Sequence, residues 1–168
     1  GIKKLPDLIA QYGNRVLLVT GQRSFPESPH WRTLLAALEK AGVDWAQVRI
    51  NDEPSPQNVD EAVRQFHGKG FTAIAGIGGG SVLDAAKAIA GLLPVGDSVM
   101  DYLEGVGPEK PYSGPALPFI AVPTTAGTGS ETTGVSIFDL TGMHAKTGIA
   151  SRRLKPTLGL LDPDNTRT

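Results

Sequence analysis

The chain has 168 residues, 40% of them hydrophobic, and a formal net charge of −1 at pH 7. This hydrophobic content is enough for a packed core and argues against disorder, while the near-neutral charge gives no electrostatic basis for binding nucleic acid or an anionic membrane. Cysteine is absent, which excludes disulfides, thiolate metal sites and a cysteine nucleophile.

Neither a membrane-spanning run nor a targeting segment stands out in the sequence. We find no apolar run of about 18 residues and no signal-peptide pattern, so the default expectation is a cytoplasmic protein without a membrane partner. The chain opens at Gly1 without a methionine and stops just after a strand-like run. We therefore expect it to be part of a longer protein.

Helices and strands are predicted to alternate along the first two-thirds of the chain. Short apolar runs predict strands at 15–20, 45–50, 71–77 and 119–122, and helical spacing predicts helices at 2–12, 28–40, 57–66 and 82–91. A short helix at 97–103, a loop at 108–118 and strands at 134–138, 146–150 and 158–161 follow from the same reasoning. Such alternation predicts an α/β fold, a Rossmann-like parallel sheet flanked by helices.

Polar turns follow three of the predicted strands, after Thr20, Ile77 and Val122. In a parallel sheet the carboxyl ends of neighbouring strands meet at the same edge, and ligands bind there. We therefore expect these three turns to converge on one rim.

The stretch 73–90, AIAGIGGGSVLDAAKAIA, predicts a buried strand, a turn of three glycines and a helix opened by Ser81. Consecutive glycines can adopt positive φ and let the backbone approach a ligand closely. The N-terminus of the following helix offers unpaired N–H groups and a positive dipole end, which bind anions. This turn predicts a phosphate-bearing cofactor.

The glycine turn admits other interpretations. The dinucleotide fingerprint G-x-G-x-x-G does not fit, because a start at Gly76 places Ser81 at the third glycine, and a Walker A loop lacks its Gly-Lys-Ser/Thr. Ser81 and Asp84 have the spacing of a capping box, so a well-capped and tightly packed helix is an alternative without a ligand.

A second motif, PTTAGTGSETTG at residues 123–134, contains five threonines, one serine and three glycines. Its hydroxyl groups can bind adenine edges, ribose or phosphate oxygens. A loop of serine and threonine turns that satisfies its own backbone is the alternative.

Together, GIGGGSVLDAAKA and AVPTTAGTGSETTG resemble the iron-dependent (group III) alcohol dehydrogenase family, and the similarity runs from GIKKLPDLI to LLDPDNT. The resemblance implies that residues 1–168 form the N-terminal dinucleotide-binding domain, which is dehydroquinate synthase-like and here lacks its opening β-hairpin. An all-helical, metal-binding domain would follow residue 168. The closing segments SETTGVSIFD and KTGIASRRLKPTLGLLDP resemble the hydroxyacid–oxoacid transhydrogenase branch.

The resemblance also implies roles for individual residues around the cofactor. Backbone amides of the glycine turn would hold the pyrophosphate, Asp84 would lie near the nicotinamide side, and the threonines would line the cleft. Lys146 would lie on a strand that faces the cofactor, with a solvated strand lysine as the alternative. The implied cofactor-binding residues are Gly21, Gly78, Gly79, Gly80, Ser81, Asp84, Thr124, Thr125, Thr128, Thr133 and Lys146.

Gly21 departs from the family pattern, because many members carry an aspartate there that binds the adenosine ribose. Without that carboxylate, Arg23 could pair with a 2′-phosphate, so the sequence tolerates NADP as well as NAD. An ordinary glycine turn with a surface arginine is the alternative. Ser55 replaces an asparagine of some members and receives no role.

Metal ligands and catalytic residues are expected outside this chain. In the family, one aspartate and three histidines of the helical domain hold Fe²⁺ or another divalent ion, whereas His30, His67 and His144 here lack ligand spacing and are expected at the surface.

The implied activity is oxidation of an alcohol or hydroxy acid by hydride transfer to NAD(P), in an enzyme that is a homodimer when intact. Hydroxyacid–oxoacid transhydrogenation is one alternative, and a non-catalytic nucleotide-sensing module is another. A relative of glycerol dehydrogenase or dehydroquinate synthase would share the glycine turn, but the hydroxyl-rich loop argues against it. The chain alone is expected to bind dinucleotide weakly and to lack dehydrogenase activity.

Overall fold

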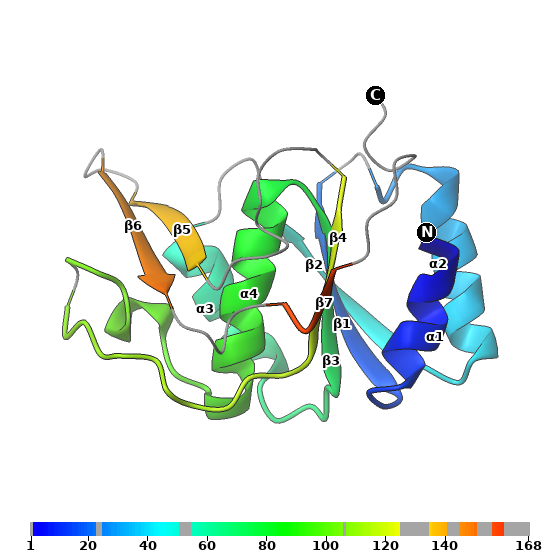
Figure 1. Ribbon diagram of the computed structural model, residues 1–168, viewed down its shortest axis with the longest axis horizontal. Coiled ribbons are helices and arrows are strands. Elements are labelled where there is room, and N and C mark those ends of the chain that lie inside the picture. The colour runs from blue at the N-terminus through cyan, green and yellow to red at the C-terminus, as the bar shows by residue number, and fades with distance from the viewer. Residues whose placement is uncertain are drawn as a thin grey trace.

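The structure is a computed structural model that describes residues 2–22, 25–50, 55–105, 107–124, 135–140, 145–150 and 156–159. Its main sheet has five parallel strands in the order β2-β1-β3-β4-β7 (Figure 1). The strands are β1 (Arg15–Gly21), β2 (Asp44–Ile50), β3 (Ala73–Gly78), β4 (Phe119–Pro123) and β7 (Leu158–Gly159). The predicted α/β fold is confirmed.

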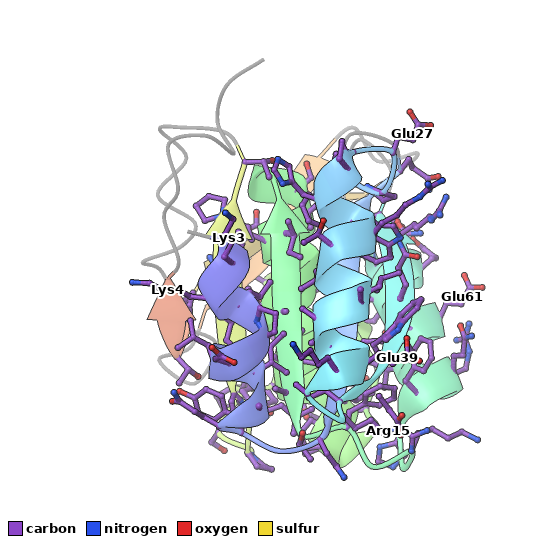
Figure 2. All side chains as sticks on the ribbon, turned by 90° about the vertical axis from the view of Figure 1, so that its right-hand side faces the viewer. Lys3, Lys4, Arg15, Glu27, Glu39 and Glu61 are labelled. Atoms are coloured by element: carbon purple, nitrogen blue, oxygen red, sulfur yellow. The ribbon has the colours of Figure 1, made fainter. Side chains whose placement is uncertain are left out.

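Helices cover both faces of this sheet, with α1 and α2 on one face and α3 and α4 on the other (Figure 1). They are η1 (Ile2–Lys4), α1 (Leu5–Ala10), α2 (Pro29–Lys40), α3 (Pro56–Phe66), α4 (Gly80–Val95) and η2 (Val99–Asp101). Figure 2 looks onto the face with α1 and α2. Arg15, at the start of β1, and Glu27, just before α2, lie at opposite ends of this face.

The strand sequences explain why both faces are covered. In β1, Leu17 and Val19 belong to the core beneath α3 and α4, whereas Val16 and Leu18 belong to the core beneath α1 and α2. All four are fully buried. A continuous apolar run of this kind is typical of a parallel strand between two layers of helices.

A separate hairpin lies outside the main sheet. β5 (Val135–Leu140) pairs antiparallel with β6 (Ala145–Ala150), and β5 packs against α4 and α3 (Figure 1). The strands predicted near these positions are confirmed, but they do not extend the parallel sheet.

The helix predicted at 82–91 is longer at both ends, since α4 runs from Gly80 to Val95 with Pro94 inside it. A proline cannot donate to the carbonyl four residues earlier, which is that of Ala90. This carbonyl instead accepts from the N–H of Leu117 at 2.9 Å, in the loop before β4. The helix then ends at Gly96, a left-handed C-cap.

Candidate functional site

The carboxyl ends of β1, β3 and β4 lie side by side at one edge of the sheet. Thr20 pairs in register with Ile77, which pairs with Val122. Beyond these strand ends, the N–H of Thr124 donates to the carbonyl of Gly78 at 2.9 Å. The three polar turns therefore begin on one rim, as the sequence predicted.

The glycine turn joins β3 to α4 through a single residue, Gly79. Gly78 is the last residue of β3, Gly79 is the N-cap of α4 with φ −82° and ψ −167°, and Gly80 is the first helical residue. None of the three has positive φ, so the turn does not use the left-handed conformations that glycine permits.

Space explains these glycines better than backbone conformation does. A Cβ on Gly78 would lie 2.7 Å from the Cβ of Val82, and one on Gly76 would lie 2.9 Å from the Cβ of Ala86. Contacts this short do not occur between real side chains, so glycine is what allows β3 and α4 to pack together. The tight packing of α4, one part of the alternative without a ligand, is therefore confirmed, and it is compatible with ligand binding.

Ser81 does not cap the helix, because α4 already begins at Gly80 and Ser81 stands in its first turn. The capping box predicted from Ser81 and Asp84 is therefore wrong. The N-cap is instead a glycine, which has no side chain to accept from the first-turn N–H groups. A helix of 16 residues that begins in this way offers backbone donors and a dipole end to an anion.

Asp84 lies on the second turn of α4 and forms an ion pair with Lys87, with 3.7 Å between carboxylate oxygen and Nζ. The side chain of Lys87 is fully buried and that of Asp84 is 15% exposed. Lys87 was not among the residues predicted from the sequence, although the spacing D-x-x-K on a helix puts both charges on one face.

Gly21 ends β1 and pairs with Ile50 of the edge strand β2. Among the described residues, a Cβ on Gly21 would meet one atom within 4 Å, the Cγ2 of Val82 at 3.9 Å, which is an ordinary contact distance. Beside it, the buried hydroxyl of Thr20 accepts from Nε2 of Gln47 at 3.0 Å. Arg23 lies outside the described residues.

The other predicted residues are placed as follows. Thr124 is half-buried directly after β4, and Lys146 belongs to β6, in register with Asp139 of β5. Thr125, Thr128 and Thr133 lie outside the described residues. The structure thus brings Gly78, Thr124 and the start of α4 together, and leaves the threonine loop untested.

Within the described ranges, no group of three His, Cys, Asp or Glu side chains could hold a metal ion. His30 and His67 are exposed, as predicted, and His144 lies outside these ranges. Among the described helices, none combines the length and apolar character that crossing a membrane requires.

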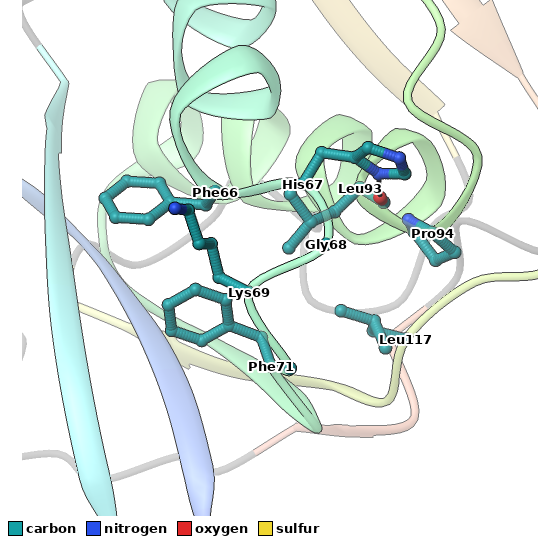
Figure 3. Close-up of a pocket in the computed structure, with 9 residues that line it drawn as sticks. Phe66, His67, Gly68, Lys69, Phe71, Leu93, Pro94 and Leu117 are labelled. Carbon is teal, nitrogen blue, oxygen red and sulfur yellow. Dashed lines mark hydrogen bonds between the residues drawn. The ribbon is translucent and has the colours of Figure 1, made fainter.

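A shallow depression of about 200 Å³ lies at the opposite edge of the sheet, where β3 and β4 begin. His67, Lys69, Phe71, Pro94 and Leu117 contribute to its lining (Figure 3). In Figure 3, the imidazole of His67 lies beside the carbonyl of Leu93, to which its Nδ1 donates at 2.6 Å. This hollow is far from the glycine turn and shares none of the predicted residues.

A parallel sheet with helices on both faces, and a glycine turn that opens a helix at its carboxyl edge, define a Rossmann-like α/β protein. The sequence profile of the iron-containing alcohol dehydrogenases matches residues 1–163. The chain therefore belongs to the iron-containing alcohol dehydrogenase family.

Individual relatives agree with this membership. The chain is 42% identical over 164 residues to the mitochondrial hydroxyacid-oxoacid transhydrogenase of Xenopus laevis. This match covers 94% of this chain and 35% of the relative. The structure is similar to NADH-dependent butanol dehydrogenase A from Thermotoga maritima, with TM-score 0.87 and 29% identity over 98% of this chain and 41% of the other. It is also similar to sulfoacetaldehyde reductase from Bifidobacterium kashiwanohense in complex with NAD⁺, with TM-score 0.82 and 28% identity over 97% and 42%.

These comparisons correct one expectation. A cytoplasmic location was predicted from the lack of a targeting pattern, and this prediction is wrong, because the matched transhydrogenases are mitochondrial. The chain spans about a third of the length of these relatives. The lack of a targeting pattern in a stretch of this length carries no information about localisation.

Proposed function

We propose that this chain binds a nicotinamide dinucleotide at the carboxyl edge of its sheet. The pyrophosphate would lie at the N-terminus of α4, against the backbone of Gly78, Gly79, Gly80 and Ser81. The adenosine end would lie beside Gly21, where β1 ends. Thr124 follows β4 at the same rim, and Asp84, Thr125, Thr128, Thr133 and Lys146 complete the proposed set.

The observation that supports the proposal most strongly is the start of α4. Close packing of Gly78 against Val82 brings the last residue of β3 directly to the helix N-terminus. Gly79 is the N-cap and makes no side-chain cap hydrogen bond, and Gly80 has no side chain either. A helix N-terminus of this kind is where a pyrophosphate would bind.

Within the intact protein, we propose that this domain serves hydride transfer between a small alcohol or hydroxy acid and NAD(P). A bound nicotinamide would supply the hydride acceptor. The residues of this chain would bind the cofactor, orient its reactive ring and exclude water around the pyrophosphate. The chain spans about a third of the matched transhydrogenases, and we assign iron to none of its residues and propose that the chain alone shows no dehydrogenase turnover.

Hydroxyacid–oxoacid transhydrogenation is a second candidate, favoured by the 42% identity to the Xenopus laevis enzyme. The two candidates differ in where the hydride ends. A transhydrogenase converts a hydroxy acid and an oxo acid together, without net reduction of added NAD(P), whereas a dehydrogenase reduces added NAD(P) with the hydroxy acid alone. A chain that senses nucleotide without catalysis would do neither in the intact protein.

The homodimer also stays a prediction, which light scattering can test.

The binding proposal is tested by Gly79→Asp with Gly79→Asn as the matched control. Both side chains are good N-caps, and φ −82° with ψ −167° is open to either residue. The aspartate carboxylate would repel an anion at the start of α4, whereas the asparagine amide carries no charge. Circular dichroism shows whether each variant is folded. We expect NADH fluorescence titration to show binding to the unchanged chain and a loss of more than about tenfold in Gly79→Asp, larger than in Gly79→Asn. Equal affinities in both variants and the unchanged chain would overturn the proposal.

A further inference from the structure

Lys87 is the one fully buried charged residue among the described side chains. It lies on α4 between Ala86 and Ala88, both of which are also fully buried. An ammonium group without water around it is strongly unfavourable unless opposite charge and hydrogen bonds replace that water. A lysine at this position therefore calls for an explanation beyond packing.

The partner in this pair is Asp84, one helical turn nearer the N-terminus and 3.7 Å away. Asp84 precedes Lys87 along the chain, the order in which the carboxylate lies toward the positive end of the helix dipole. Because both side chains are shielded from solvent, salt and water screen the pair only weakly.

Asp84 also lies only four residues after Gly80, where the proposed anion site begins. An uncompensated carboxylate at this distance would repel a pyrophosphate, since charges of the same sign interact unfavourably through a poorly screened interior. The positive charge of Lys87 makes the pair neutral as a whole. The N-terminus of α4 then keeps its attraction for an anion.

We propose that Lys87 is a positioning residue of the dinucleotide site. It fixes the carboxylate of Asp84 on the rim and cancels its charge toward the pyrophosphate. This inference rests on the proposed function, because it needs a phosphate-bearing ligand at the start of α4. Lys87 does not touch the ligand and acts through Asp84.

The test is a double-mutant cycle read by NADH fluorescence titration of Lys87→Met, Asp84→Asn and the double variant. Lys40→Met is the control, since it removes the same charge from the exposed last turn of α2. We expect Lys87→Met to weaken NADH binding about tenfold, the factor to which about 1.4 kcal/mol corresponds. Adding Asp84→Asn to Lys87→Met should restore the affinity to that of Asp84→Asn alone, and Lys40→Met should bind as the unchanged chain does.

Circular dichroism establishes that each variant is folded before it is titrated. If Lys87→Met does not fold, Lys87→Gln takes its place in the same cycle. A purely structural lysine would change the melting temperature but would give no recovery of affinity on adding Asp84→Asn.

The outcomes separate the two proposals. If the unchanged chain binds NADH and the Lys87 variant binds equally well, or its loss persists in the double variant, the role of Lys87 is overturned and the binding site stands. If the unchanged chain does not bind NADH, the proposed function itself is overturned, and this inference with it.

Discussion

Gly78 and Val82 are packed so closely that a Cβ on Gly78 would lie 2.7 Å from the Cβ of Val82 and equally far from its Cγ2. We expect Gly78→Ala to cost about 1–3 kcal/mol of unfolding free energy, because the added methyl overpacks the junction of β3 and α4. Urea unfolding of Gly78→Ala, Val82→Ala and the double variant measures this. The double variant should lose at least about 1 kcal/mol less unfolding free energy than the two single variants lose together. Losses that simply add would contradict the contact.

A substitution at Gly21 tests the preference between NAD and NADP. Of the described residues, a Cβ here meets only Val82 Cγ2 at 3.9 Å, an ordinary contact distance, so we expect Gly21→Asp to fold. Its carboxylate would repel a 2′-phosphate and bind the ribose of NAD, so NADPH affinity should fall about tenfold or more relative to NADH. Gly21→Asn is the uncharged control and should shift this ratio less. An unchanged ratio in Gly21→Asp would contradict the placement of the adenosine beside β1.

Tyr102 tests the hydrogen bond to Asp97. Its hydroxyl donates to Oδ2 of Asp97 at 2.5 Å, and this bond, together with burial and the negative charge of Asp97, raises the pKa of Tyr102 to about 12. The folded state thus favours the neutral phenol. This contribution to stability is complete below about pH 10 and is lost as the pH rises to about 12.

The measurement is the ultraviolet absorbance of phenolate as a function of pH, with Tyr102→Phe used to assign the transition. Asp97→Asn should lower the pKa of Tyr102, because the amide carries no negative charge to oppose ionisation. If the pKa of Tyr102 is the same in Asp97→Asn as in the unchanged chain, the Asp97 carboxylate does not cause the raised pKa.

Ser55 received no role from the sequence, and the structure supplies one. It is the N-cap of α3, where its hydroxyl accepts from the N–H of Asn58 at 3.2 Å and the Asn58 side chain accepts from the N–H of Ser55. We expect Ser55→Ala to cost about 1 kcal/mol in urea unfolding. Ser55→Thr keeps the hydroxyl and should lose less, and equal losses would argue against the cap.

The layered sheet could be predicted because a strand that is buried on both faces has a continuous run of apolar residues in the sequence. β1, β3 and β4 are continuous apolar runs, and α2 and α3, between β1 and β3, carry apolar faces at helical spacing. The convergence of the turns after these strands follows from parallel pairing alone. The hairpin of β5 and β6 could not be placed, since short strands do not reveal their partners.

The details of the glycine turn could not be predicted, because glycine both permits positive φ and removes a Cβ. Only the position of Val82 shows that space is the reason at Gly78. Ser81 and Asp84 suggested a cap because the helix was predicted to begin at residue 82, whereas α4 begins at Gly80. The burial of Lys87 was hidden as well, since α4 is covered by the sheet, α3 and β5, and so has no apolar stripe to locate it.

Amide chemical shifts measure most directly whether a dinucleotide pyrophosphate lies at the N-terminus of α4. We would titrate the ¹⁵N-labelled chain with NADH and follow its backbone amides by two-dimensional NMR. We predict that the largest shifts occur at residues 78–84 and at Thr124. Shifts centred instead on the depression around His67 and Phe71, or no shifts at saturating NADH, would contradict it.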